Sequence, residues 1–229
     1  MKKQKQIIVL LVLVTLLSIT GCSKGKSSES STNTIKPTST KVTTGKVEGL
    51  SYTNEFFGLS IQIPDKWAVQ DKQSVDEMQE VGKDAVAGDD KELKKALDES
   101  KNTSLNLLTV FQHPLGSNIT FNPSFVSIAE NVSQFPSIKT GKEYLEGTKE
   151  ILKKAQVEYV FGKDIYEEKI DGISFNVMEL SVTVNNIKIF QKYYSTITNK
   201  YSLNFIITYT TDEELKSVQQ VLNSIKFAK

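Results

Sequence analysis

Two residue types decide most of the chemistry open to this chain, because each occurs once: histidine, at His113, and cysteine, at Cys22. A serine hydrolase triad needs a histidine, yet the sequence contains no Gly-x-Ser-x-Gly elbow. A zinc site normally draws on several His or Cys ligands, and one histidine falls short. We therefore expect no metal centre, no cofactor and no catalytic residue, and we expect His113 to be an ordinary residue at the end of a strand.

Carboxylates are the remaining candidates for acid–base or metal chemistry. Ten acids and six lysines lie between Asp71 and Asn102. Oxygen-bearing side chains alternate there as in a calcium loop, at Asp98, Ser100, Asn102 and Ser104, but the central glycine and terminal glutamate of an EF-hand are missing. This composition is typical of a solvated helical face. Roles for the adjacent pairs Asp89-Asp90 and Glu167-Glu168 depend on geometry that sequence does not give.

Cys22 ends an N-terminal segment with the features of an export signal. Three lysines in the first six residues precede an apolar run from Ile7 to Leu17, and small residues then lead to the cysteine. The run is shorter than the roughly 20 apolar residues that span a bilayer. We therefore predict that residues 1–21 are a signal peptide that is removed.

Ile19-Thr20-Gly21-Cys22 resembles the lipobox of bacterial lipoproteins. The resemblance implies cleavage between Gly21 and Cys22, a diacylglyceryl thioether on Cys22 and acylation of the new N-terminus. Membrane lipid, reached through acylated Cys22, is then a partner of the protein on the extracytoplasmic face of the cell membrane. The alternatives are a leader that is discarded whole or a transmembrane stub. Acylation of the only cysteine excludes disulfides and thiol catalysis in the exported domain.

Residues 22–47 are predicted to be a flexible tether. Residues 23–47 contain twelve Ser or Thr, five lysines and one acid, so their net charge is +4. The domain predicted at residues 48–229 has 20 lysines and 26 acids, a net charge of −6. A basic stalk would lie near anionic lipid, although a plain solvated spacer explains the same composition. The acidic domain contains no arginine, so nucleic acid is not an expected partner.

The second half of the domain predicts a four-stranded antiparallel meander. Turn dipeptides recur every 14 residues, at Asp171-Gly172, Asn185-Asn186 and Asn199-Lys200. They separate the predicted strands 164–170, 173–184, 187–198 and 201–209. The phase of apolar residues changes at Val177-Met178, which indicates either a bulge or a sheet covered on both faces. Earlier strands are predicted at 59–63, 105–111 and 125–128.

Four capping boxes predict four helices, each followed by apolar residues at helical spacing. The boxes pair Ser74 with Glu77, Asp89 with Glu92, Thr140 with Glu143 and Thr211 with Glu214. The apolar stripes are expected to pack on the sheet.

Two stretches resemble PsbP-like domains. Asn54–Trp67, in which a short aromatic and glycine lead enters a strand before Pro64, is similar to the opening of that family, and Tyr201–Phe227 is similar to its close. The resemblance implies an α+β fold in which an antiparallel sheet has helices on both faces, an α/β/α sandwich, across residues 48–229. Trp67 is expected to close one end of the core. The family includes photosystem subunits, a nucleotide-release factor and lipoproteins, so the fold assigns no reaction.

The function expected from these features is that of a noncatalytic accessory or binding lipoprotein, with an envelope protein as a possible partner. One alternative is an envelope hydrolase that uses carboxylates. The other is a small solute-binding lipoprotein. Residues 48–229 are few for the two lobes that would close on a solute, which disfavours this alternative.

Overall fold

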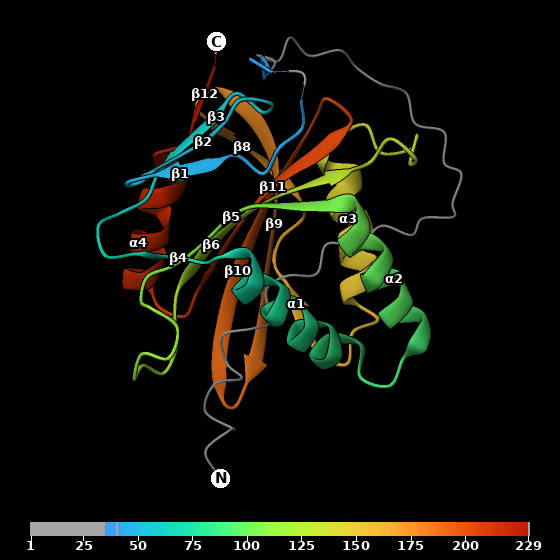
Figure 1. The fold of residues 1–229 in the computed structure, drawn as a ribbon. Helices are drawn as coiled ribbons and strands as arrows, with labels where there is room; N and C mark the ends of the chain where they lie inside the picture. Colours follow the sequence, from blue (N-terminus) through green and yellow to red (C-terminus); the bar gives the residue numbers. More distant parts are fainter. Residues whose placement is uncertain (1–34, 40, 229) are drawn as a thin grey trace.

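A large antiparallel sheet forms the centre of the computed structural model, which describes residues 35–39 and 41–228 (Figure 1). The predicted signal peptide, its cleavage site between Gly21 and Cys22, the lipidation site at Cys22 and the first part of the predicted tether, up to residue 34, lie outside these residues. In spatial order the strands are β4 (Ala68–Val69), β5 (Ser104–Phe111), β6 (Ser124–Asn131), β11 (Tyr201–Tyr209), β10 (Ile187–Thr198), β9 (Ile173–Val184) and β7 (Tyr159–Phe161), and β8 (Tyr166–Ile170) also pairs with β9.

The predicted meander of β8, β9, β10 and β11 is confirmed. All six residues of its three turns have positive φ, including 50° at Asn185 and 63° at Asn186. This is the left-handed backbone of the two-residue turns whose twist matches the flanking strands. The register runs without a break through Val177 and Met178, so the change of phase there reflects apolar cover on both faces rather than a bulge.

A second, smaller antiparallel sheet joins the two ends of the domain. Its strands, in spatial order, are β1 (Lys46–Glu48), β2 (Ser51–Asn54), β3 (Leu59–Gln62) and β12 (Lys226–Phe227). Phe227 pairs with Leu59. The segments Asn54–Trp67 and Tyr201–Phe227 are therefore joined in one sheet.

Helices cover both faces of the large sheet, as predicted for an α+β sandwich (Figure 1). On one face α4 (Asp212–Asn223) and the small sheet pack on the core that contains Phe205. On the other face α3 (Gly141–Leu152) packs on the core that contains Ile206, and α1 (Lys72–Ala87) and α2 (Lys91–Thr103) lie beside it. Neighbouring strand residues point to opposite faces, so Phe205 and Ile206 belong to different cores.

Two of the four predicted helix starts are correct, and two are shifted. Thr140 and Thr211 begin α3 and α4 with complete capping boxes. However, α1 begins after Asp71 rather than Ser74, and α2 begins after Asp90 rather than Asp89. In both shifted cases the aspartate carboxylate accepts a hydrogen bond from a backbone N–H three residues later, as an N-cap should.

The chain joins the folded body earlier than residue 48, where the predicted tether ends. Ile35 is only 4% exposed and belongs to the main core, and the backbone N–H of Thr38 donates to Glu55 O at 2.9 Å. Strand β1 begins at Lys46. Part of the segment predicted to be tether therefore contacts the folded body, since Ile35 lies in the main core and Val42 packs against it.

Trp67 lies at the border of the main core rather than inside it. Its side chain is half-buried and packs against the core that contains Leu59 and Ile61. The preceding residue, Lys66, has a φ of 68°. The prediction that Trp67 closes the core is therefore only partly correct, and a fully buried tryptophan is not observed.

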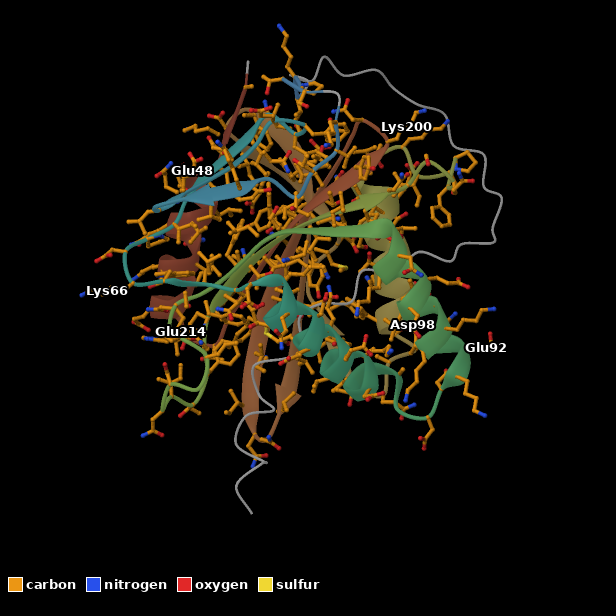
Figure 2. All side chains as sticks on the ribbon, viewed as in Figure 1. Glu48, Lys66, Glu92, Asp98, Lys200 and Glu214 are labelled. Carbon is orange, nitrogen blue, oxygen red and sulfur yellow. The ribbon has the colours of Figure 1, made fainter. Side chains whose placement is uncertain are left out.

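The surface of the described body is polar, with charged side chains such as Glu48, Lys66 and Glu92 projecting outward (Figure 2). Within residues 35–39 and 41–228, no helix has the length and apolar content needed to cross a membrane.

Gly141, the first residue of α3, is expected to be the least replaceable glycine in the fold. A Cβ at this position would lie 2.0 Å from the backbone oxygen of Ser195 on β10, so helix and sheet would have to separate. We expect Gly141→Ala to destabilise the domain by about 3 kcal/mol, the upper range for overpacking, in urea denaturation. Glu146→Ala, an exposed change in the same helix, is the control. Equal midpoints for the two variants would contradict this packing.

Candidate functional site

Glu130 lies at the end of β6. Among the described residues it is the only buried carboxylate, with 1% of its surface exposed. Three hydroxyl groups donate hydrogen bonds to it. Tyr144 Oη lies 2.8 Å from Oε2, and Ser100 Oγ lies 3.2 Å from Oε1. Thr103 Oγ1 lies 3.3 Å from Oε1 and shares its proton with the backbone oxygen of Ser100, which is 3.0 Å away. Glu130 therefore links strand β6 to the C-terminal turn of α2 and to α3.

The alternation of β6 directs Glu130 toward the helices. Val126 and Ile128 occupy the same face of the strand and pack in the core beneath α3. Tyr144 stands one turn into α3, whose start is fixed by the capping box at Thr140. Ser100 and Thr103 are one helical turn apart on α2 and so lie on one side of it.

Burial raises the pKa of Glu130 to about 7, because the charged carboxylate loses its hydration. The hydrogen bonds from Tyr144, Ser100 and Thr103 oppose this shift but do not cancel it. The carboxyl group therefore changes charge near neutral pH, which an exposed glutamate does not do.

An open cavity of about 670 Å³ adjoins this carboxyl group. Its lining includes Glu130 of β6 and Glu99, Ser100 and Thr103 of α2. The other lining residues come from neighbouring segments of the chain. Apolar walls come from Val42, Leu105, Phe135 and Tyr201, and amide groups come from Asn102, Asn131 and Gln134. Its volume falls within the roughly 300–1,000 Å³ of small-molecule sites, and like them it combines apolar walls with a few polar groups.

Tyr201 packs against two phenylalanine rings in this cavity wall. Its ring meets Phe56 and Phe57 edge to face, with centroids 5.6 Å and 5.7 Å away. Val42 lies in the segment that the sequence predicted to be tether, so that segment contributes to the cavity as well.

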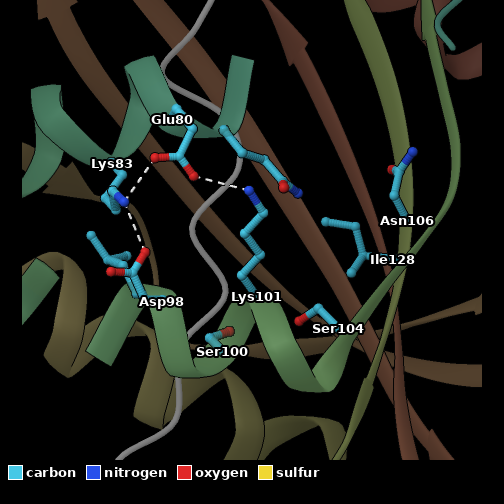
Figure 3. Close-up of a pocket in the computed structure, with 10 residues that line it drawn as sticks. Glu80, Lys83, Asp98, Ser100, Lys101, Ser104, Asn106 and Ile128 are labelled. Carbon is cyan, nitrogen blue, oxygen red and sulfur yellow. Dashed lines mark hydrogen bonds and ion pairs between the residues drawn. The ribbon is translucent and has the colours of Figure 1, made fainter. Parts of the chain in front are cut away.

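A second cavity, of about 40 Å³, lies on the α1 side of α2 (Figure 3). It has room for little more than water. Ser100 and Ser104 line both cavities. Beside the smaller cavity, Lys83 bridges Glu80 and Asp98 at 2.8 Å each, and Lys101 pairs with Glu80 at 2.9 Å. Hydrogen bonds from Lys83 and Lys101 hold the pKa of Glu80 down at about 2. These pairs join α1 to α2.

The residues considered for a calcium loop do not converge. Asp98 points toward Lys83 on α1, whereas Ser100 points toward Glu130, because positions two apart on a helix face different directions. Within residues 35–39 and 41–228, no group of three or more His, Cys, Asp or Glu side chains could hold a metal ion. Of the adjacent acid pairs, Asp90 caps α2, and Glu167 and Glu168 lie on β8.

His113 lies in the loop that follows β5. Its backbone N–H donates to Asn122 Oδ1 at 2.9 Å, and its backbone oxygen accepts from Asn122 Nδ2 at 2.7 Å. These bonds involve the main chain, so they fix the loop and assign no chemistry to the imidazole.

A half-buried ion pair joins β9 to β10 on the face of the large sheet opposite to Glu130. Lys192 Nζ lies 2.8 Å from Glu179 Oε1, to which Tyr166 Oη also donates at 2.6 Å. Burial raises the pKa of Glu179, but the bonds from Lys192 and Tyr166 outweigh burial and leave it below its usual value. The carboxylate is thus a satisfied structural anion.

Sequence reasoning missed Glu130. The strand was predicted only for residues 125–128, and no role was assigned to the acid two residues later. The signal was present in the alternation, since Val126, Ile128 and Glu130 fall on one face. Its partners Ser100 and Tyr144 lie 30 and 14 residues away, and no local pattern connects them.

Comparisons with known proteins identify no family. No family model matches the chain, and no curated protein matches it. Solved structures with a similar arrangement include LpqN, involved in cell envelope biogenesis of Mycobacterium tuberculosis, at 11% identity and a TM-score of 0.41 over 75% of this chain and 83% of that one.

Two other solved structures are similar to parts of the chain. A Pseudomonas aeruginosa protein of unknown function, proposed to be a regulator, is 16% identical over 48% of this chain and 75% of its own, with a TM-score of 0.38. A Bacteroides thetaiotaomicron protein is 10% identical over 75% of this chain and 46% of its own, with a TM-score of 0.39. These sequence identities and TM-scores are too low to transfer a role from any of the three proteins to this chain.

Proposed function

We propose that this chain is a lipid-anchored bacterial lipoprotein on the extracytoplasmic face of the cell membrane, and that its domain is a noncatalytic binding module whose ligand occupies the cavity beside Glu130. The anchor rests on the export signal and the lipobox-like Ile19–Cys22. The resemblance of Asn54–Trp67 and Tyr201–Phe227 to PsbP-like domains supports an accessory role, because that family includes lipoproteins and extrinsic subunits.

The open cavity is the single observation that carries the binding role. Its volume of about 670 Å³ lies within the range of small-molecule sites, roughly 300–1,000 Å³. The half-buried aromatic residues Phe135 and Tyr201 offer contact area at low entropic cost, and Asn102 and Asn131 offer donors and acceptors that fix orientation. A small solute fits this space, and an envelope protein could present one side chain to it.

A carboxylate-dependent envelope hydrolase is the second candidate, favoured by one observation. The pKa of Glu130, raised by burial to about 7, suits proton transfer near neutral pH. Yet its carboxylate already accepts hydrogen bonds from three hydroxyl groups. The other acid of the cavity, Glu99, is exposed on α2. We therefore place binding first.

The binding role can be tested by blocking the cavity. The full-length protein, purified from its own membranes in mild detergent, is compared with Ser133→Trp, which puts a large side chain at an exposed position of the lining. Native mass spectrometry should detect a bound molecule on the wild type and none on the variant. An equal bound mass on both proteins, or none on either, would contradict the proposal. Glu213→Trp, on the exposed side of α4, is the matched control and should retain the molecule.

A further inference from the structure

The lining of the cavity beside Glu130 contains acids but no base. It includes two carboxyl groups, those of Glu99 and Glu130, and none of the described residues that line it is lysine or histidine. Lys95 Nζ, outside the lining, lies 3.9 Å from Glu99 Oε1, but both side chains are exposed, and such a surface pair is weak. The chain contains no arginine. An anionic ligand would therefore lose its hydration here without gaining a countercharge.

The remaining walls suit an organic body. Val42 and Leu105 are aliphatic, and Phe135 and Tyr201 are aromatic. Aromatic rings attract organic cations through their quadrupole, most strongly where water is displaced. Asn131 and Gln134 add amide groups at the rim without adding charge.

From this lining we infer that the ligand is a small organic cation, with an amine or quaternary ammonium group on an apolar carbon skeleton. The inference rests on the proposed binding function and narrows it to one chemical class. Glu99 supplies the exposed negative charge at the mouth, where it attracts the cation during approach. Glu130, Phe135 and Tyr201 line the space that the cation would fill.

Three probes of nearly the same shape test the charge requirement. Choline carries the cation, 3,3-dimethylbutan-1-ol is its neutral carbon isostere, and 3,3-dimethylbutanoate carries the opposite charge. Each is titrated into the full-length protein in uncharged maltoside detergent, and NMR follows the backbone amides of Asn131 and Tyr201. We expect choline to bind at least tenfold more tightly than the alcohol, and the carboxylate to bind most weakly.

The variant pair Glu99→Gln and Glu92→Gln completes the test. Both change an exposed glutamate of α2, but only Glu99 lines the cavity. Glu99→Gln should weaken choline binding several-fold, and Glu92→Gln should leave it unchanged. Equal affinity for choline and the alcohol, or tighter binding of the carboxylate, would overturn the inference that the ligand is a cation but would still support a binding site in this cavity. If no probe shifts the amide signals of Asn131 or Tyr201, both the inferred cationic ligand and the proposed binding function are overturned.

Discussion

Raising the pH from 5 to 7.5 should lower the free energy of unfolding by about 2 kcal/mol through Glu130 alone. The folded-state pKa of Glu130 is about 7, against its usual value of 4.5. Between these values the folded protein holds a proton that the unfolded chain has released. Linkage then makes the folded state lose stability as the pH rises through this window, and the loss ends above the folded pKa. A full shift between 4.5 and 7 corresponds to about 3 kcal/mol, most of which falls within this range.

Urea denaturation at several pH values measures this effect, and Glu130→Gln isolates it. The amide keeps the size of the side chain but does not titrate here, so the difference between wild type and variant should depend on pH. Acids whose pKa is lowered, such as Glu80 and Glu179, lose their stabilising effect below this window and act in the opposite direction. A difference between wild type and Glu130→Gln that stays constant from pH 5 to 7.5 would mean that Glu130 is not buried as described.

Replacement of Cys22 by serine should remove the protein from the membrane and leave an unprocessed precursor. The wild type is expected to carry a diacylglyceryl group and usually a further acyl chain. Two or more chains hold a protein stably at a bilayer, whereas one chain binds only marginally. Serine offers no thiol for the thioether, and cleavage after Gly21 is expected to require that modification. The measurements are metabolic labelling with a radioactive fatty acid and fractionation of cells.

The neighbouring change Ser23→Ala is the control for this experiment. It alters the first residue after the cysteine and should leave labelling, processing and fractionation as in the wild type. Fatty acid that still enters Cys22→Ser would refute the lipobox interpretation of Ile19–Cys22.

The elements that sequence predicts well in this protein are those with local signals. The turns at Asn185-Asn186 and Asn199-Lys200 need positive φ, which asparagine tolerates better than most residues, so their positions fixed the lengths of β9, β10 and β11. The capping boxes at Thr140 and Thr211 gave correct helix starts because the Thr and Glu side chains bond to backbone N–H groups only three residues apart. Both signals depend on a few consecutive residues.

The features that sequence did not predict depend on contacts between distant segments. Ile35 reads as an isolated apolar residue in a polar stretch, and only its docking on the main core reveals its role. The short strand β12 forms because Phe227 meets Leu59 across most of the domain. Glu130 acquires its pKa from burial by α2 and α3, which are separated from it in sequence. Tertiary context of this kind overrides local propensity.

The most direct test of the central claim, that the cavity beside Glu130 is where this protein meets its ligand, is photo-crosslinking in living cells. The photoreactive amino acid p-benzoylphenylalanine replaces Gln134, an exposed residue of the cavity rim, or Glu213, an exposed residue of α4 on the other side of the sheet. After irradiation, mass spectrometry of the purified protein should find an adduct at position 134 and none at position 213. No adduct at 134, or the same adducts at both positions, would contradict the claim.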